Sequence, residues 1–135
     1  MIQYTTTVNA SLQSVWQHLI NKINHPENFV PGISDVIIIE RNEEFVIRKM
    51  TVALGEIATT LTEKITFKPY KIRFLLTEHP KFEGYVDNDI KPISENETEM
   101  TFTINWVDKI TNEHFDKVEM VKDSVLKSKD FIENN

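Results

Sequence analysis

The chain has 135 residues, of which 40% are hydrophobic and 27% are charged, a composition typical of one soluble domain. Its formal net charge of −6 comes from acidic and basic residues mixed along the sequence, so neither nucleic acid nor an anionic membrane surface is expected as a partner. The absence of cysteine excludes disulfides, thiol nucleophiles and thiolate metal sites, and it is consistent with a cytoplasmic location.

The first elements are predicted as a strand followed by helical segments. Residues Ile2–Val8 alternate in polarity and are rich in threonine, which predicts a strand. Ser11 is suited to cap a helix over residues 11–23. The apolar stripe of this helix consists of Leu12, Val15, Trp16, Leu19 and Ile23. Residues 27–30 are expected to form one further short helical turn.

Six strand-like segments follow with very short connections. They cover residues 33–41, 44–54, 56–68, 70–78, 81–92 and 97–107, and Gly55 is expected to form one of the turns between them. Connections this short allow only antiparallel neighbours, because a parallel crossover needs a dozen or more residues. The pattern therefore predicts an antiparallel meander.

The last element is predicted as a long helix over residues 111–132, with Thr111 as its cap. Its apolar stripe consists of Phe115, Val118, Val121, Val125 and Ile132, and Met120 falls on the opposite side. Since the sheet is the one large apolar partner available, this helix is expected to cross it and to leave a space between the two. The whole order predicts one α+β domain over residues 1–135.

Polar residues in the inward phase of the strands are the main functional signal. Thr59 and Glu63 are in phase with apolar residues of their strand, and Asn88 is so placed on another. Arg48 is also in phase with apolar residues of its strand, although other apolar residues beside it leave open which face of that strand points inward. A buried carboxylate is costly unless it is paired or solvated. Glu63 therefore faces a wet cavity, pairs with a group such as Arg48, or lies at a bulge that turns it outward, and the sequence leaves these three open.

Motifs with a defined chemistry are not found. The four histidines lack metal-ligand spacing, so no metal is expected, and His79, which precedes a proline in a turn, is interpreted as a surface residue. Asp87 and Asp89 share the outward face of one strand and are interpreted as a solvated pair. The scattered glycines form no phosphate-binding loop, so no cofactor is expected.

The order of elements resembles the helix-grip fold of the START-like superfamily, also called SRPBCC, which includes birch-pollen-allergen-like proteins, polyketide cyclases and lipid-transfer domains. The matching motifs are Trp16-x-x-Leu19, Phe29-Val30-Pro31-Gly32-Ile33, and Glu63-Lys-Ile65-Thr-Phe67-Lys-Pro69 followed by Arg73-Phe74. More narrowly, the chain is similar to a subfamily associated with antibiotic-biosynthesis genes.

This resemblance implies a seven-stranded antiparallel sheet curved around the last helix, with an apolar cavity for a sterol, lipid, hormone or aromatic polyketide. Glu63, Arg48 and Asn88 would orient such a ligand. The apolar residues expected to line the cavity are Leu61, Phe74, Phe82, Val86, Phe102, Ile104, Trp106, Val118, Val121 and Val125.

Three functions follow as hypotheses. The first is binding of a small apolar or aromatic molecule. The second is an enzyme of the polyketide cyclase/aromatase or dehydratase type with Glu63 as acid or base, although no residue set matches the catalytic arrangement of the aromatase/cyclase members. The third is a protein-interaction domain similar to the co-chaperone branch. A homodimer is a further option that the sequence leaves open.

Overall fold

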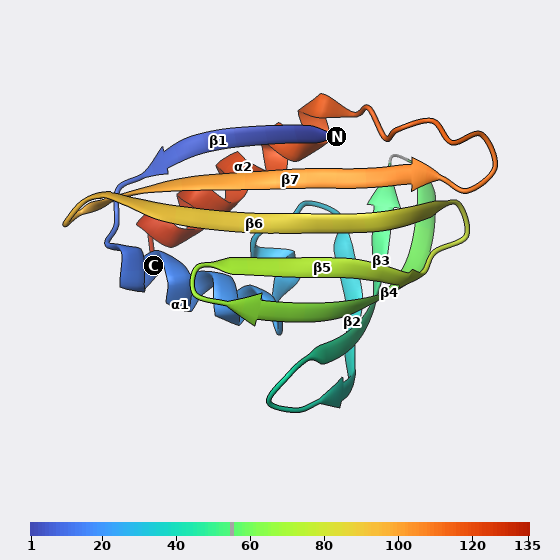
Figure 1. Cartoon of the computed structure of the whole chain (residues 1–135), viewed down its shortest axis with the longest axis horizontal. Coiled ribbons are helices and arrows are strands. Elements are labelled where there is room, and N and C mark those ends of the chain that lie inside the picture. Colours follow the sequence, from blue (N-terminus) through green and yellow to red (C-terminus); the bar gives the residue numbers. More distant parts are fainter. Residues whose placement is uncertain (55) are drawn as a thin grey trace.

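Seven antiparallel strands form one sheet in the order β1-β7-β6-β5-β4-β3-β2, in a computed structural model that describes residues 1–54 and 56–135 (Figure 1). The elements are β1 (Ile2–Val8), α1 (Leu12–Lys22), the short 3₁₀ helix η1 (Pro26–Asn28), β2 (Ile33–Arg41), β3 (Val46–Leu54), β4 (Ile57–Lys68), β5 (Lys71–Glu78), β6 (Phe82–Ser94), β7 (Glu97–Asp108) and α2 (Val118–Glu133). The predicted α+β helix-grip architecture is confirmed. The turn predicted at Gly55 lies outside the described residues.

The sheet is a meander of six strands, β2 to β7, and β1 forms the edge strand beside β7. Strands β2 to β7 pair consecutively, as their short connections predicted, and β1 pairs with β7 in the register Ile2 to Ile104. The two partners in this last pair come from opposite ends of the chain. The sheet therefore joins the N-terminal strand to the strand that precedes α2.

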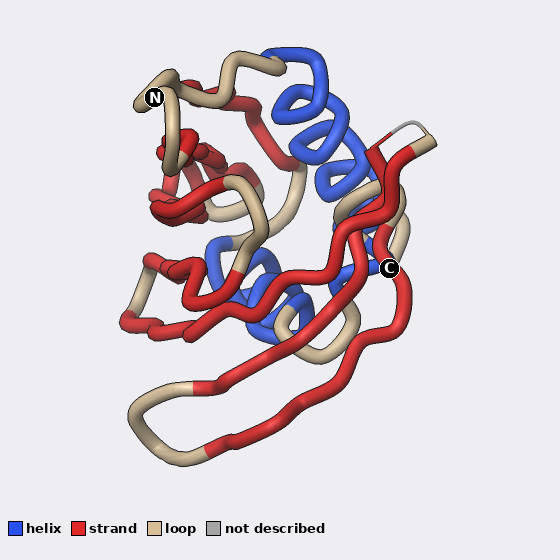
Figure 2. Tube along the Cα trace, turned by 90° about the vertical axis from the view of Figure 1, so that its right-hand side faces the viewer, coloured by secondary structure: helices blue, strands red, loops and turns tan. Residues whose placement is uncertain are grey.

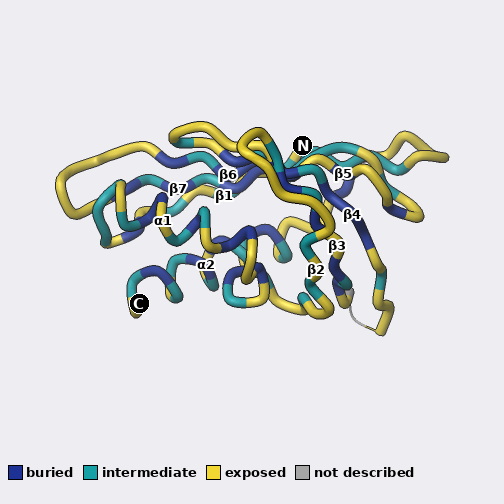
Figure 3. The backbone as a smooth tube through the Cα atoms, turned by 90° about the horizontal axis from the view of Figure 1, so that it is seen from below, coloured by how far each residue is buried: buried dark blue, intermediate teal, exposed yellow. Residues whose placement is uncertain are grey.

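The sheet curves so that its concave face surrounds the helices. Figure 2 shows the strands as an arc around the two helices, and Figure 3 shows both helices beneath one face, where the buried residues are concentrated. Register shifts interrupt the β2–β3 pairing between Ser34 and Ile37 and the β4–β5 pairing between Thr62 and Glu63. Such bulges bend a sheet locally. At the second one Leu61, Thr62 and Glu63 are all buried despite the usual alternation.

Helix α1 begins where the sequence predicted. The Ser11 side chain accepts a hydrogen bond from the backbone N–H of Ser14 at 3.2 Å, which satisfies one of the free donors of the first turn. Val15, Trp16 and Leu19 of its stripe are buried against the sheet. Ile23 lies at its C-terminal cap.

Helix α2 begins at Val118, not at Thr111 as predicted. The Asp108 carboxylate accepts the backbone N–H groups of Ile110 and Thr111, and this turn holds the chain in a non-helical path. Asn112 then has a φ of 60°, which a right-handed helix does not allow. The residues that follow run back beside β7, where the Phe115 N–H donates to the Trp106 carbonyl at 2.9 Å.

Neither helix of the described chain has both the length and the apolar character that crossing a membrane requires.

Candidate functional site

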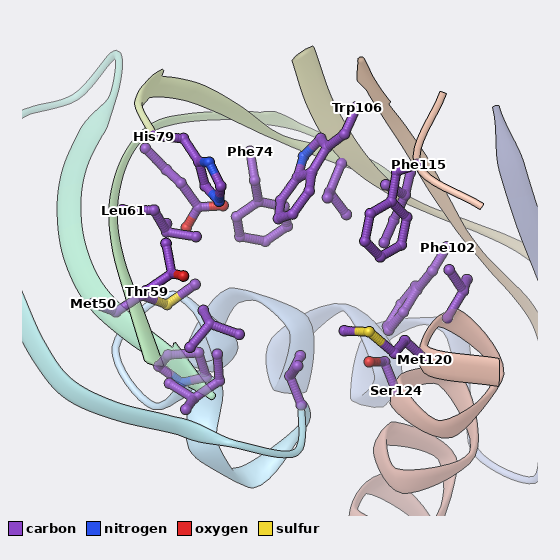
Figure 4. Close-up of a pocket in the computed structure, with 18 of the residues that line it drawn as sticks. Met50, Thr59, Leu61, Phe74, His79, Phe102, Trp106, Phe115, Met120 and Ser124 are labelled. Carbon is purple, nitrogen blue, oxygen red and sulfur yellow. The ribbon is translucent and has the colours of Figure 1, made fainter. Parts of the chain in front are cut away.

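A cavity of about 100 Å³ lies between the concave face of the sheet and the helices, where the sequence predicted a space (Figure 4). Its walls come from every part of the fold except β1. They consist of Lys22 from α1; Pro26, Val30 and Ile33 from the segment after it; Arg48, Met50 and Val52 from β3; Thr59, Leu61 and Glu63 from β4; Phe74, His79 and Val86; Phe102, Ile104 and Trp106 from β7; and Phe115, Met120, Val121 and Ser124.

Side-chain contacts group these residues toward two ends. The Lys22 Nζ donates to Asn88 and lies over the rings of Phe102 and Phe74, and the Arg48 guanidinium lies 5.3 Å from the centre of the Phe74 ring. Trp106 packs instead against the rings of His79 and Phe115. The cavity thus has a polar end near Arg48 and an aromatic end near Trp106.

Arg48 and Glu63 form the buried ion pair that was one of the three alternatives for Glu63. The Arg48 Nη2 donates to Glu63 Oε1 at 2.6 Å, and both side chains are less than 5% exposed. The Arg48 Nη1 donates to the carbonyls of Lys22 and Ile23 at 3.2 and 3.0 Å. These carbonyls end α1, where the helix dipole favours a cation. One guanidinium therefore joins α1 to β3 and β4.

Lys22 is the charged residue of this end that the sequence did not single out. It is 4% exposed, and its Nζ donates to Asn88 Oδ1 at 2.6 Å. The same atom lies 4.0 Å from the centre of the Phe102 ring and 5.1 Å from that of Phe74. The pKa of Lys22 is lowered to about 7, chiefly by burial and secondly by the nearby Arg48 charge, while the Glu63 charge acts against both.

Polar groups in and directly behind the cavity wall include unpaired donors. Among the described residues, the buried side-chain nitrogen atoms that lack a hydrogen-bond partner are Arg48 Nε, Asn88 Nδ2 and Trp106 Nε1. All three are N–H donors, and an unpaired buried donor is costly. The site is therefore better matched to a molecule that brings acceptor atoms than to one that brings donors.

The aromatic end is built from four rings that pack in tilted and edge-to-face arrangements. Trp106 lies 5.5 Å from His79, 5.7 Å from Phe82 and 5.5 Å from Phe115 between ring centres. His79 is 9% exposed, so its interpretation as a surface residue is wrong. Its Nδ1 accepts the N–H groups of Lys81 and Phe82, and burial lowers the pKa of the ring.

Most of the predicted site residues line this cavity, and four do not. Those that do are Glu63, Arg48, Leu61, Phe74, Val86, Phe102, Ile104, Trp106 and Val121. Asn88 is fully buried one layer behind, where it accepts from Lys22, and Phe82 packs behind Trp106. Val125 is buried in the main core. Val118, the first residue of α2, is 51% exposed.

Two residues of the wall, Lys22 and Met120, were not assigned to it from the sequence. Lys22 follows Leu19 by three residues and Val15 by seven, so helical spacing places it on the apolar stripe of α1. Met120 was assigned to the side of α2 away from the core, and this is wrong because it lines the cavity beside Val121 (Figure 4). The cause is the later start of α2, which left its orientation against the sheet unknown.

The predicted solvated pair on β6 is also different in the structure. Asp87 is 5% exposed, and Arg73 binds both of its carboxylate oxygens at 2.8 and 2.9 Å. This pair lies on the convex face of the sheet, away from the cavity. Across residues 1–54 and 56–135, no cluster of three or more acidic, histidine or cysteine side chains is arranged to hold a metal ion.

Comparison with known families gives one match over almost the whole chain. The family model described as "Acetylaranotin biosynthesis cluster protein L" (AtaL) matches residues 2–130. Among curated proteins, no sequence matches the chain significantly.

Solved structures show the same fold at low sequence identity. The Zhui aromatase/cyclase from Streptomyces sp. R1128 superposes with a TM-score of 0.80 at 16% identity, over 98% of this chain and 90% of that one. A START superfamily protein from Mycobacterium smegmatis gives 0.75 at 13% identity, over 98% and 94%. The di-domain aromatase/cyclase StfQ of the steffimycin biosynthetic pathway gives 0.76 at 15% identity, over 99% of this chain and 45% of that one.

Proposed function

The chain belongs to the AtaL family of the START-like superfamily, and from this premise we propose that it binds a small apolar or aromatic molecule in the cavity between its sheet and α2. The observation that carries the proposal is the combination of apolar walls with a few buried polar groups at one end. Ligand sites are generally of this kind, since apolar walls provide affinity and a few polar groups fix orientation. The polar end here holds Arg48, Glu63 and Lys22.

The size of the cavity defines which molecules fit it without rearrangement. Its volume of about 100 Å³ is somewhat below the roughly 150 Å³ of an engineered cavity that admits benzene. A molecule with one ring therefore fits after small side-chain shifts. Met50 and Met120 lie in the wall, and unbranched methionine side chains adapt easily to new shapes. Rotation of these two side chains would make room for a longer lipid-like or polyketide-like molecule.

Titration with benzyl alcohol, benzoate and decanoate tests the proposal. Trp106 lines the cavity and Trp16 does not, so the Trp16→Phe variant makes Trp106 the single fluorescent indole. We expect a saturable change in its emission with at least one of the three compounds. If none of them gives a saturable change, the binding proposal is wrong.

Replacing Ser124 by leucine should weaken this binding by about tenfold or more, which corresponds to roughly 1.4 kcal/mol. Ser124 faces the cavity from α2, and a larger branched side chain there occupies space that the ligand needs. The matched control is Asp123→Leu, because Asp123 is exposed on the same helix. The titration above measures both variants. Equal affinities for the two would place the ligand outside the cavity.

A cyclase- or dehydratase-type enzyme is the second candidate, since ionisable groups are buried beside the cavity. As acid or base, Glu63 would have to exchange a proton while Oε1 is bound to Arg48 at 2.6 Å, which makes this role less favourable than orientation of a ligand. Glu63→Gln should then abolish turnover of a poly-carbonyl substrate in protein that near-ultraviolet circular dichroism shows to be folded. Full turnover by this variant would exclude Glu63 as the acid or base.

A further inference from the structure

The amine of Lys22 is placed as a reactive group at the wall of an apolar cavity. Its Nζ donates a hydrogen bond to Asn88 Oδ1 at 2.6 Å and lies over the rings of Phe102 and Phe74. Both of these rings also line the cavity. A molecule that fills the cavity would therefore lie next to this amine.

The charges around Lys22 determine its protonation. Two other charged side chains act on it, Arg48 from β3 and Glu63 from β4, and these two are bound to each other. Their effects on the amine oppose one another, so burial is the largest influence and lowers the pKa to about 7. At neutral pH about half of the molecules then carry the free amine, which is the nucleophilic form.

We propose that Lys22 captures an aldehyde or ketone in the cavity as an imine. The inference rests on the proposed ligand-binding function and specifies its chemical class, a carbonyl compound with an apolar or aromatic body.

The reaction balances with the groups present. The lone pair of the free amine attacks the carbonyl carbon, a C–N bond forms, and the C=O π electrons move to the oxygen. Both hydrogens of the amine then leave with that oxygen as water, and the C=N bond replaces the C=O bond.

The surroundings favour both the capture and the survival of the product. A carbonyl brings only an acceptor atom, and the polar end has donors in surplus, including the buried Arg48 Nε. Apolar walls keep bulk water from the imine, which limits its hydrolysis. An anionic ligand would bind the same cationic groups without forming a covalent bond to Lys22. The experiment below separates covalent capture from such non-covalent binding.

The test uses benzaldehyde with sodium cyanoborohydride, which reduces an imine to a stable amine, followed by peptide mapping by mass spectrometry. At pH 7 we expect the adduct at Lys22 to exceed that at Lys91, whose side chain is 70% exposed, by about tenfold or more, because an ordinary lysine is almost wholly protonated there. Adduct formation at Lys22 should rise between about pH 6 and 8 and then level off, whereas that at Lys91 continues to rise. Mapping also separates Lys22 from the terminal amine, whose ordinary pKa is near 8.

Two variants control for the position of the adduct. Lys22→Arg keeps a cation and should lose the adduct in that peptide, while Lys91→Met should keep it. Benzyl alcohol, which has the same ring but no carbonyl, measures binding separately in the unmodified protein. If benzyl alcohol binds saturably and Lys22 reacts no more than Lys91, imine capture is excluded and the binding function stands. If Lys22 reacts no more than Lys91 and none of benzyl alcohol, benzoate and decanoate binds saturably, both proposals are wrong.

Discussion

Replacing Glu63 by leucine is expected to lower the free energy of unfolding by about 3–5 kcal/mol, the usual cost of removing one partner of a buried ion pair. The variant leaves the Arg48 guanidinium buried, and the Lys22 ammonium nearby loses the one negative charge that stabilises it. Urea denaturation followed by circular dichroism measures the change.

The double variant Arg48→Met with Glu63→Leu provides the internal control. Replacing a whole buried ion pair by apolar residues of similar size is often neutral, so more than half of the lost stability should return. The matched surface control is Glu99→Leu on β7, whose pair with Lys91 at 3.5 Å is exposed and should contribute only about 0–1 kcal/mol. A cost for Glu63→Leu no larger than for Glu99→Leu would contradict a buried pair at this site.

The stability of the wild-type protein should rise with pH between about 7 and 10 because of Lys22. In the unfolded chain this amine holds its proton up to about pH 10.4, whereas in the folded chain burial lowers its pKa to about 7. Within this window the unfolded state binds one more proton, so raising the pH favours the folded state. The gain is on the order of 4 kcal/mol by pH 10, since each pKa unit corresponds to about 1.36 kcal/mol.

Lys22→Met isolates this contribution, because every other titrating group is present in both proteins. Denaturation at pH 7, 8, 9 and 10 should give a smaller rise in stability for this variant than for the wild type. Lys91→Met, which removes an exposed amine, should keep the wild-type slope. Parallel curves for Lys22→Met and the wild type would mean that the folded protein keeps Lys22 charged at an ordinary pKa.

The strands were the most predictable part of this molecule. Alternation identifies an inward face without knowledge of the partner strand, so Phe102, Ile104 and Trp106 were expected at the cavity wall, which they line. Glu63 was also found this way, because a carboxylate in an apolar phase stands out. Whether Glu63 faces a cavity, forms an ion pair or lies at a bulge could be decided only from the pairing of the strands. In the structure Glu63 is paired with Arg48 at the cavity wall, next to a bulge.

The helical side of the site was less predictable, for two physical reasons. The side chain of Asp108 takes up backbone donors that a helix would need, and a left-handed residue at Asn112 follows, so the helical pattern of the segment did not decide its structure. Lys22 is long and charged, and such residues are usually exposed. Its burial depends on Asn88 and on two rings from distant strands, which no local pattern reveals.

Several sequence expectations concern partners and remain predictions. These are the absence of nucleic-acid and membrane partners, the cytoplasmic location, the homodimer and the protein-interaction alternative. The cavity and its polar end support binding of a small molecule and do not test these other expectations.

The pairing of β1 with β7 has a consequence for synthesis on the ribosome. Strand β1 emerges first, and its hydrogen-bonding neighbour emerges only after five other strands have left the exit tunnel. Until then β1 is an unpaired strand, whose free backbone N–H and C=O groups can pair with other chains. Because β7 also carries Phe102, Ile104 and Trp106, the cavity is incomplete before that moment, so a molecule bound there would stabilise only the finished protein.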